Sequence, residues 1–344
     1  MLRRGAALAA DSLFALRPLL WIPAVALFEA GRTVAFPFGT RISPRSGAGA
    51  FVVGAPTAGA ISAELLALLA LLGAVHLANA ARDRETDLVN RKGRLTASGS
   101  VGPARLLLLC AACLIATFFL ALRSAPTARS LLGAAAVLGA AYVVPGIELK
   151  RRAGLDLAAN AIGYGGVALF LGASAPGGSL ENLSQRALGG ALVEWALAAG
   201  PYVLGVGSVA LCTMVADRGG DEAAGLRTAA VALGEARAGS CAATLAWGSG
   251  LWGLFTADLV PAVWGILAGA WLSLAGERLS GRDAWNRAAI GLQISFLAIL
   301  AARSWVPFMF AVFVGTASSL YYFARFRDAY PAARVGSGGV GAGR

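Results

Sequence analysis

Two acidic clusters with the same spacing are the residues of this chain best suited to chemistry. Asp83-Arg-Glu-Thr-Asp87 and Asp217-Arg-Gly-Gly-Asp221 both read D-R-x-x-D, and each follows a strongly apolar stretch. Carboxylates beside such stretches are costly, and at membrane depth they usually mark an ion, a proton path or a substrate site. Because the two clusters match, we expect one site built from two halves.

Helical spacing places oxygen ligands on one face in each half. Asn79, Asp83 and Asp87 recur every four residues, which predicts one stripe along a helix, and Asp217 and Asp221 share a face in the same way. Like-charged carboxylates repel each other unless a cation lies between them, and oxygen ligands suit a hard ion such as Mg²⁺. We therefore predict that these five residues bind Mg²⁺ and that the four aspartates are catalytic. The alternative is a solvated helix end with ordinary charges.

Basic residues near the clusters indicate a phosphorylated ligand. Two of these residues, Arg94 and Arg227, follow the first and the second acidic cluster. The third, Lys150, lies in the loop after the fourth predicted span. Mg²⁺ keeps several waters and usually binds through a few carboxylates plus substrate phosphates, so the pattern predicts a Mg²⁺–diphosphate clamp with these three cations on the phosphates. The helix that carries the second acidic cluster is expected to break soon after it, at glycines that let the backbone approach a ligand: Gly219, Gly220 and Gly225.

The composition is that of a multi-pass membrane protein. Hydrophobic residues make up 58% of the 344 residues and charged residues only 14%, and the mean hydropathy is +0.69. The low-charge stretches predict an all-α integral membrane fold, a bundle of nine to ten transmembrane helices with a central cavity and cytoplasmic helical loops. We expect one polytopic domain over residues 1–330 and a disordered, Gly-rich tail over residues 331–344.

The distribution of basic residues predicts the orientation. With ten spans and a cytoplasmic N-terminus, 22 of the 29 Lys and Arg residues fall on the cytoplasmic side, in agreement with the positive-inside rule. We therefore expect a multi-pass protein, of a bacterial inner membrane, with both acidic clusters and the active site on the cytoplasmic side. The net charge of +11 then reflects topology, and no basic stripe with interleaved aromatics predicts nucleic-acid binding.

Four stretches occur in order along the chain: Arg17-Pro-Leu-Leu-Trp21, Asn79 to Gly99, Tyr142-Val-Val-Pro-Gly-Ile-Glu-Leu-Lys150, and Asp217 to Gly234. Together they resemble the motifs of the UbiA superfamily of intramembrane prenyltransferases, over roughly residues 15–235. The stretch that contains Asp83 and Asp87 is nearest to the chlorophyll synthase-like branch. The chain departs from the usual family pattern at Ala80, at Leu95 and at the pair Thr213-Met214.

The resemblance implies a Mg²⁺-dependent prenyl transfer. A polyprenyl diphosphate would bind through its diphosphate between the clusters, and a lipophilic acceptor, an aromatic compound or a quinone or pigment precursor, would attack the allylic carbocation. On this basis Arg17 joins the predicted diphosphate-binding residues, and Tyr142, Asn160 and Tyr164 are the predicted contacts to acceptor or prenyl chain. Asn160 and Tyr164 are one turn apart in an apolar stretch, where polar groups either orient a ligand or bond a neighbouring helix.

Two other functions fit part of the pattern. A cation transporter would use the carboxylates for a permeating ion, but their position at helix ends beside basic residues favours the enzyme. A family member that has lost catalysis and handles lipid would be consistent with Ala80 and Thr213. His76, the single histidine, is open to two interpretations, a general base or a hydrogen-bonded interior residue.

Overall fold

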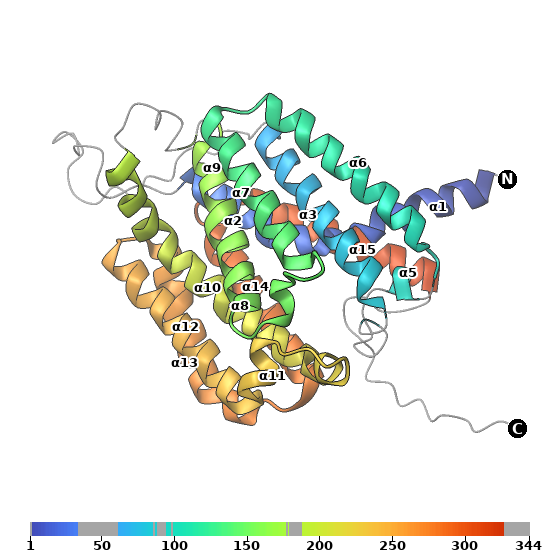
Figure 1. Ribbon diagram of the computed structural model, residues 1–344. Helices are drawn as coiled ribbons and strands as arrows, with labels where there is room; N and C mark the ends of the chain where they lie inside the picture. Colours follow the sequence, from blue (N-terminus) through green and yellow to red (C-terminus); the bar gives the residue numbers. More distant parts are fainter. Residues whose placement is uncertain are drawn as a thin grey trace, which may run out of the picture.

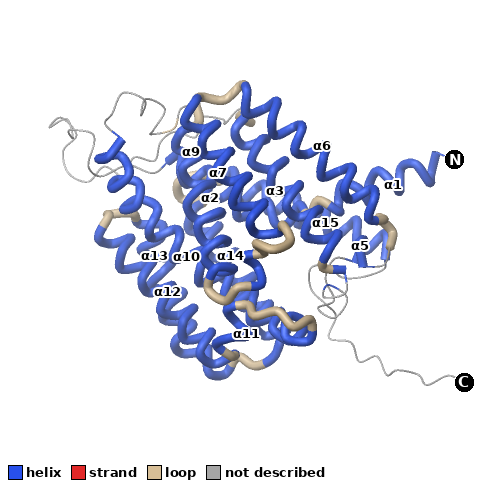
Figure 2. Tube along the Cα trace, viewed as in Figure 1, coloured by secondary structure: helices blue, strands red, loops and turns tan. Residues whose placement is uncertain are grey.

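The computed structural model describes residues 2–33, 61–84, 87, 94–97, 99–176, 178 and 188–326. Within these ranges the regular structure is helical, and the extended pairing is confined to one isolated bridge between Arg152 and Arg227 (Figure 2). The all-helical prediction is confirmed for this part of the chain. The predicted tail over residues 331–344 lies outside it.

The helices follow one another along the whole described chain (Figure 1). In order they are α1 Leu2–Ala15, the 3-10 helix η1 Pro18–Trp21, α2 Ile22–Thr33, α3 Ala63–Arg82, α5 Arg94–Ala97, α6 Pro103–Leu122, α7 Pro126–Val143, the 3-10 helix η2 Leu149–Arg151, α8 Leu155–Asn160, the π-helix η3 Ala161–Ala168, α9 Leu169–Ser174, α10 Leu188–Ala223, α11 Ala229–Leu233, α12 Glu235–Phe255, α13 Leu259–Ala275, the 3-10 helix η5 Gly276–Arg278, α14 Gly281–Leu300 and α15 Val306–Phe326.

Six helical stretches of the described chain are long and apolar enough to cross a membrane. They are Ala7–Thr33, Ala63–Arg82, Pro103–Leu122, Leu155–Ser174, Trp195–Ala223 and Val306–Phe326. On α6, large apolar side chains such as Leu108, Phe118 and Phe119 are exposed, as expected for a helix that faces lipid. The predicted count of nine to ten spans is not confirmed and stays a prediction.

Close backbone contact between α2 and α9 holds the centre of the bundle together. A Cβ atom added at Gly31 would lie 1.8 Å from the carbonyl oxygen of Leu169, and one added at Gly172 would lie 1.8 Å from that of Phe28. Only glycine allows two helix backbones to approach this closely. Phe28 and Leu169 are both buried in the largest apolar core of the structure. This contact fixes the inner wall on which the site is built.

One end of the bundle gathers the elements that carry both acidic clusters. The α6–α7 and α12–α13 connections lie at one end, and α5 and α11 lie at the other (Figure 1). At this second end η2 and α11 pack against α8, and α11 packs against α10. The predicted break at Gly219 and Gly220 is wrong, because α10 continues to Ala223. The third predicted position is confirmed, because the chain turns at Gly225, whose φ of 68° is in the left-handed region.

Candidate functional site

The first acidic cluster begins where α3 ends. Asp83 is the C-cap of α3, and its amide donates to the carbonyl of Asn79 at 2.9 Å. The amide of Asp87 donates to the carbonyl of Asp83 at 2.7 Å. Four-residue backbone bonds therefore connect all three predicted ligands, although α3 itself ends at Arg82 and Asp83 leaves the helical conformation with φ −91° and ψ 18°.

Lys150 lies directly on this cluster. Its Nζ donates to Asn79 Oδ1 at 2.8 Å and to Asp83 Oδ1 at 2.6 Å, and the residue is 6% exposed. A second set of contacts fixes the η2 segment that carries it, because Arg82 at the end of α3 pairs with Glu148 at 2.8 Å and donates to the carbonyl of Val143 at 2.8 Å. The loop between α7 and α8 is thus tied to α3 at several points.

Arg17 reaches the same cluster from the other side. It lies between α1 and η1 in the left-handed conformation, with φ 55° and ψ 58°, which is unusual for a residue with a side chain. Its guanidinium forms an ion pair with Asp87, whose residue exposure is only 7%. Two cations predicted to hold a diphosphate, Arg17 and Lys150, are therefore in direct contact with the predicted metal ligands.

The second cluster lies in the last turns of α10. Asp217 faces the central cavity, and Asp221 follows one turn later on the same helix. Arg227 is exposed and its backbone pairs with Arg152, which joins the chain after this cluster to the chain before α8. The backbone of Arg94 begins α5, and its side chain is outside the described part of the structure.

Asp156 in α8 holds the chain that follows the second cluster, and no sequence motif predicted this role. The residue is 1% exposed, and its Oδ2 accepts the amide of Ala229 at 2.7 Å while Oδ1 accepts the amide of Leu157 at 2.8 Å. This carboxylate therefore holds the start of α11, two residues after Arg227. An acid at the start of an otherwise apolar helix was the available signal.

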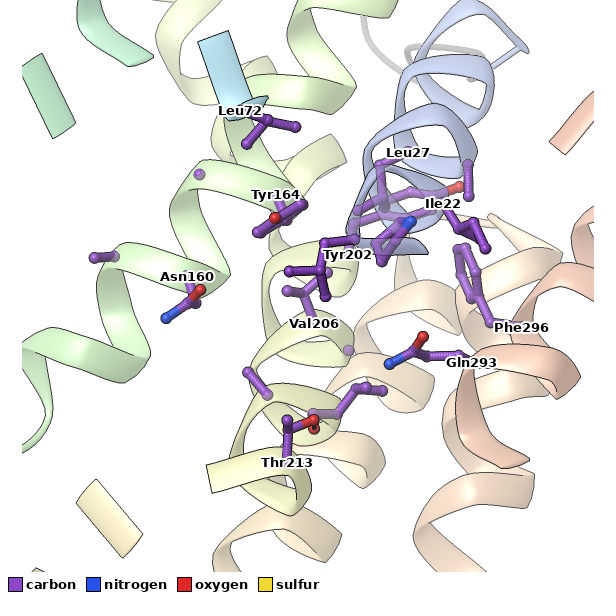
Figure 3. A pocket seen from close by; sticks show the side chains of 18 of the residues that line it. Ile22, Leu27, Leu72, Asn160, Tyr164, Tyr202, Val206, Thr213, Gln293 and Phe296 are labelled. Atoms are coloured by element: carbon purple, nitrogen blue, oxygen red, sulfur yellow. Dashed lines mark hydrogen bonds between the residues drawn. The ribbon is translucent and has the colours of Figure 1, made fainter. Parts of the chain in front are cut away.

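A cavity of about 400 Å³ lies between the two clusters and runs into the bundle. Asn79 and Asp217 line it from α3 and α10, so the two halves face one space. Tyr142, Asn160 and Tyr164 also line it, and Figure 3 shows Asn160 and Tyr164 along one wall. The structure brings all three predicted acceptor residues to the cavity that the clusters share.

Hydrogen bonds orient the polar side chains of this wall. Asn160 donates to the Tyr142 hydroxyl at 3.2 Å and to the carbonyl of Asp156 at 2.9 Å. The Tyr164 hydroxyl and His76 Nε2 share a hydrogen bond at 3.3 Å. Tyr164 is part of the π-helix η3, a helix type that is frequent at functional sites. His76 is thus a hydrogen-bonded cavity residue.

Sequence reasoning missed the opposite wall. Four polar or aromatic residues from α10, α13 and α14 line the cavity there: Tyr202, Trp264, Gln293 and Phe296. They lie in apolar stretches that are typical of helix packing, and the last three lie beyond residues 15–235, the region that resembles known motifs. The one signal was Gln293, an uncharged amide in the middle of a predicted span.

The oxygen ligands suit Mg²⁺ in combination with a phosphorylated ligand. Within the described ranges, no group of three or more His, Cys, Asp or Glu side chains is arranged to hold a metal by itself. Mg²⁺ commonly takes one or two carboxylates and completes its shell with water and substrate phosphates. Asn79 with Asp83 on one side and Asp217 on the other are ligands of this kind.

Comparison with known proteins identifies the family and the fold of this chain. The model of the UbiA prenyltransferase family matches residues 46–289. No curated protein matches the chain in sequence.

Solved structures show the same fold at low sequence identity. A UbiA homolog from Archaeoglobus fulgidus is 18% identical and superposes with a TM-score of 0.58 over 88% of this chain and 99% of that chain. The same archaeal homolog bound to GPP and Mg²⁺ gives a TM-score of 0.57 at 17% identity, over 85% of this chain and 99% of that chain. A structure of digeranylgeranylglyceryl phosphate synthase gives 0.54 at 14% identity, over 89% and 98%.

Proposed function

This chain belongs to the UbiA prenyltransferase family, and from that premise we propose that it transfers a polyprenyl group from a polyprenyl diphosphate to a lipophilic acceptor. The C–O bond between the prenyl chain and the diphosphate breaks, a bond from the same carbon to the acceptor forms, and the acceptor loses a proton. One observation carries the proposal: Asn79 and Asp217, one from each acidic cluster, line the same cavity.

The acidic clusters would hold Mg²⁺, and the cations beside them would hold the diphosphate. Bound Mg²⁺ neutralises the charge that develops on a departing diphosphate. Its ligands would be Asn79, Asp83, Asp87, Asp217 and Asp221. Lys150 and Arg17 already contact this cluster, so a bound diphosphate would find both cations fixed in place. Arg94 and Arg227 are further phosphate contacts in the same proposal.

The cavity would take the reacting end of the prenyl chain and the acceptor. Its wall is mostly apolar, and Tyr142, Asn160 and Tyr164 add a small number of fixed polar groups. Ligand sites typically combine an apolar wall with a few fixed polar groups in this way. A wall of this kind also limits the access of water, which would otherwise capture the carbocation.

The same proposal includes the membrane arrangement. The chain would cross a bacterial inner membrane with nine to ten helices, and the excess of basic residues at the cluster end would keep the site on the cytoplasmic side. Within the family we propose a position near the chlorophyll synthase-like branch, on the stretch from Asp83 to Asn90 with Ser98-Gly99.

Release of diphosphate from a prenyl diphosphate tests the function. Membranes with the protein would be incubated with Mg²⁺, labelled geranyl or geranylgeranyl diphosphate and a panel of lipophilic phenols and quinols. We expect release that stops with EDTA and falls at least about 100-fold in Asp83→Ala and Asp217→Ala. Asp283→Ala, at an exposed position of α14, is the matched control. Equal rates in wild type and Asp83→Ala would overturn the proposal.

A further inference from the structure

Gln293 places an amide halfway along α14 and toward the cavity. The helix begins at Gly281, at the end of the bundle that carries the clusters, because the amide of Gly281 donates to Glu235 Oε1 at 2.9 Å beside α11. With a rise of 1.5 Å per residue, Gln293 lies about 18 Å further along. In Figure 3 its amide points from α14 toward the wall of α10 that carries Val206 and Thr213.

The neighbouring polar groups of this wall all have partners within the protein. The Tyr202 hydroxyl donates to Asp258 at 2.7 Å, Ser249 donates to the carbonyl of Pro201 at 2.7 Å, and Trp264 donates to the carbonyl of Leu292 at 3.0 Å. Thr213 turns back on its own helix and donates to the carbonyl of Val209 at 3.1 Å. In these groups the donor hydrogens are therefore already used within the protein.

Gln293 differs from these neighbours. Among the residues that the structure describes, none forms a hydrogen bond with its side chain, although the amide has two donor hydrogens and an acceptor oxygen. An amide in an apolar setting is costly unless it is paired. Its position on the cavity therefore leaves its bonding capacity for whatever occupies the cavity.

The charge of the cavity wall restricts the chemistry of that occupant. Of the residues that line the cavity, only Arg17 and Asp217 are formally charged at neutral pH, and both belong to the cluster end. A carboxylate or phosphate group at Gln293 would have been transferred out of water to a place with no cation to pair with. Burial of an unpaired charge is strongly unfavourable. A neutral hydroxyl or carbonyl would be matched by the amide.

We propose that Gln293 binds a neutral hydroxyl or carbonyl group of the acceptor and thereby selects acceptors that carry such a group at their buried end. The proposal rests on the proposed prenyl transfer. It restricts the acceptor of that reaction to compounds of the phenol, quinol or quinone type whose group beside Gln293 is uncharged. Gln293 lies beyond residues 46–289, the part of the chain that the family model matches.

Binding of two probes that differ in one group tests this selection without any turnover. The purified full chain in detergent, with Mg²⁺, would be equilibrated by dialysis against labelled 2-naphthol or 2-methylnaphthalene, with empty micelles as the blank. Gln293→Leu removes the amide at similar size. Ser295→Ala is the matched control, because Ser295 lies on α14 at an exposed position, where its hydroxyl donates to the carbonyl of Leu292 at 2.9 Å.

We expect wild type and Ser295→Ala to bind 2-naphthol more tightly than 2-methylnaphthalene. In Gln293→Leu the affinity for 2-naphthol should fall about tenfold, the change expected from one net hydrogen bond, while the affinity for 2-methylnaphthalene stays the same. Unchanged binding of 2-methylnaphthalene also shows that the variant is folded.

Several results would overturn the proposal. Equal or undetectable binding of the two probes to wild type would do so. A preference for 2-naphthol that persists in Gln293→Leu would also do so, because it would show that the amide does not contact the hydroxyl of the probe. Loss of both probes from a Gln293→Leu protein with an unchanged melting temperature would count against it too. The diphosphate-release assay fails or succeeds independently of these measurements, so the two proposals are tested separately.

Discussion

Lys150 and Asp83 form a partly buried ion pair, with Nζ 2.6 Å from Oδ1, although 67 residues separate them in the chain. The lysine side chain is 7% exposed and the aspartate side chain 19%. Removal of one partner from such a pair leaves an uncompensated charge in a poorly solvated site, which is far more costly than loss of a surface ion pair. The lysine therefore compensates the charge of the first cluster before any metal or diphosphate binds.

Replacement of Lys150 by Met should reduce activity and change the dependence on metal. We expect diphosphate release to fall at least about 100-fold, because the departing diphosphate loses a fixed cation. The apparent affinity for Mg²⁺ without donor should rise, since Asn79 and Asp83 lose the ammonium that competes with the metal. Release rates and Mg²⁺ titrations monitored by melting temperature measure the two effects.

The neighbouring Arg151→Met is the control for this prediction. Arg151 pairs with Glu148 at 3.3 Å from a side chain that is 49% exposed, so its loss should cost less than about 1 kcal/mol and leave Mg²⁺ titration unchanged. If Arg151→Met and Lys150→Met behaved alike, the effect would come from general positive charge in the loop and not from the buried pair.

Asp156 should act on the donor site through the backbone that it holds. In Asp156→Asn one side-chain oxygen must replace the two that accept the amides of Leu157 and Ala229, so one buried amide loses its partner. We expect a loss of about 1–3 kcal/mol in stability and a several-fold rise in KM for the prenyl diphosphate, since the chain that carries Arg227 is released. Thermal unfolding and initial-rate kinetics measure both.

A matched variant at the other end of the bundle separates stability from site geometry. Asp258 is also buried and accepts three bonds, from the amide of Val260 in α13 at 3.1 Å, from the hydroxyl of Tyr202 in α10 at 2.7 Å and from Nη2 of Arg303 at 2.5 Å. Asp258→Asn should lower the melting temperature as well, yet leave the KM for donor unchanged. Equal increases in KM in both variants would contradict the role of Asp156.

The parts of the site that follow from helical period could be predicted from the sequence. Backbone hydrogen bonds link Asn79 to Asp83 and Asp83 to Asp87, as expected from their four-residue spacing, which is a local property of the chain. The apolar stretch before them predicted the helix that leads into this cluster. Lys150 was predicted to bind phosphate as one of the basic residues near the clusters, but its contact with Asp83 depends on how the α7–α8 loop folds back. No local pattern contains that information.

The errors have physical reasons as well. Gly219 and Gly220 were expected to end the helix, because glycine is a weak helix former, but Gly220 is buried in α10 and tertiary packing overrides the propensity there. Asp156 belongs to no motif, and the amide of Ala229 that it accepts lies 73 residues further along the chain. Gln293 has no motif around it, and only the cavity makes it conspicuous.

The α2–α9 contact should be intolerant of a single methyl group. In Gly31→Ala the new Cβ would overlap the carbonyl oxygen of Leu169, so the two backbones must separate. We expect a loss of about 3 kcal/mol or more, at or beyond the upper end of overpacking costs, and a clearly lower melting temperature. Gly133→Ala on α7 is the control, because its Cβ meets no atom within 4 Å and should leave stability nearly unchanged.

Contacts at the two ends of the chain position Arg17. Asp11 in α1 is 2% exposed, accepts the hydroxyl of Tyr321, and pairs with Arg325 through Nε at 3.1 Å and Nη2 at 3.2 Å. Phe14 stacks on Tyr321 with ring centroids 3.9 Å apart. Arg17 follows three residues later in its left-handed conformation, which persists only where the surroundings impose it.

Asp11→Asn should therefore weaken donor binding from a distance. With the ion pair to Arg325 lost, α1 is held less firmly on α15, and Arg17 is less often in place beside Asp87. We expect the KM for the prenyl diphosphate to rise about three- to tenfold with a smaller change in kcat, because Arg17 would act mainly in binding. Asp283→Asn, at an exposed position in the first turn of α14, is the control. A lower melting temperature with an unchanged KM would show that Asp11 only supports the fold.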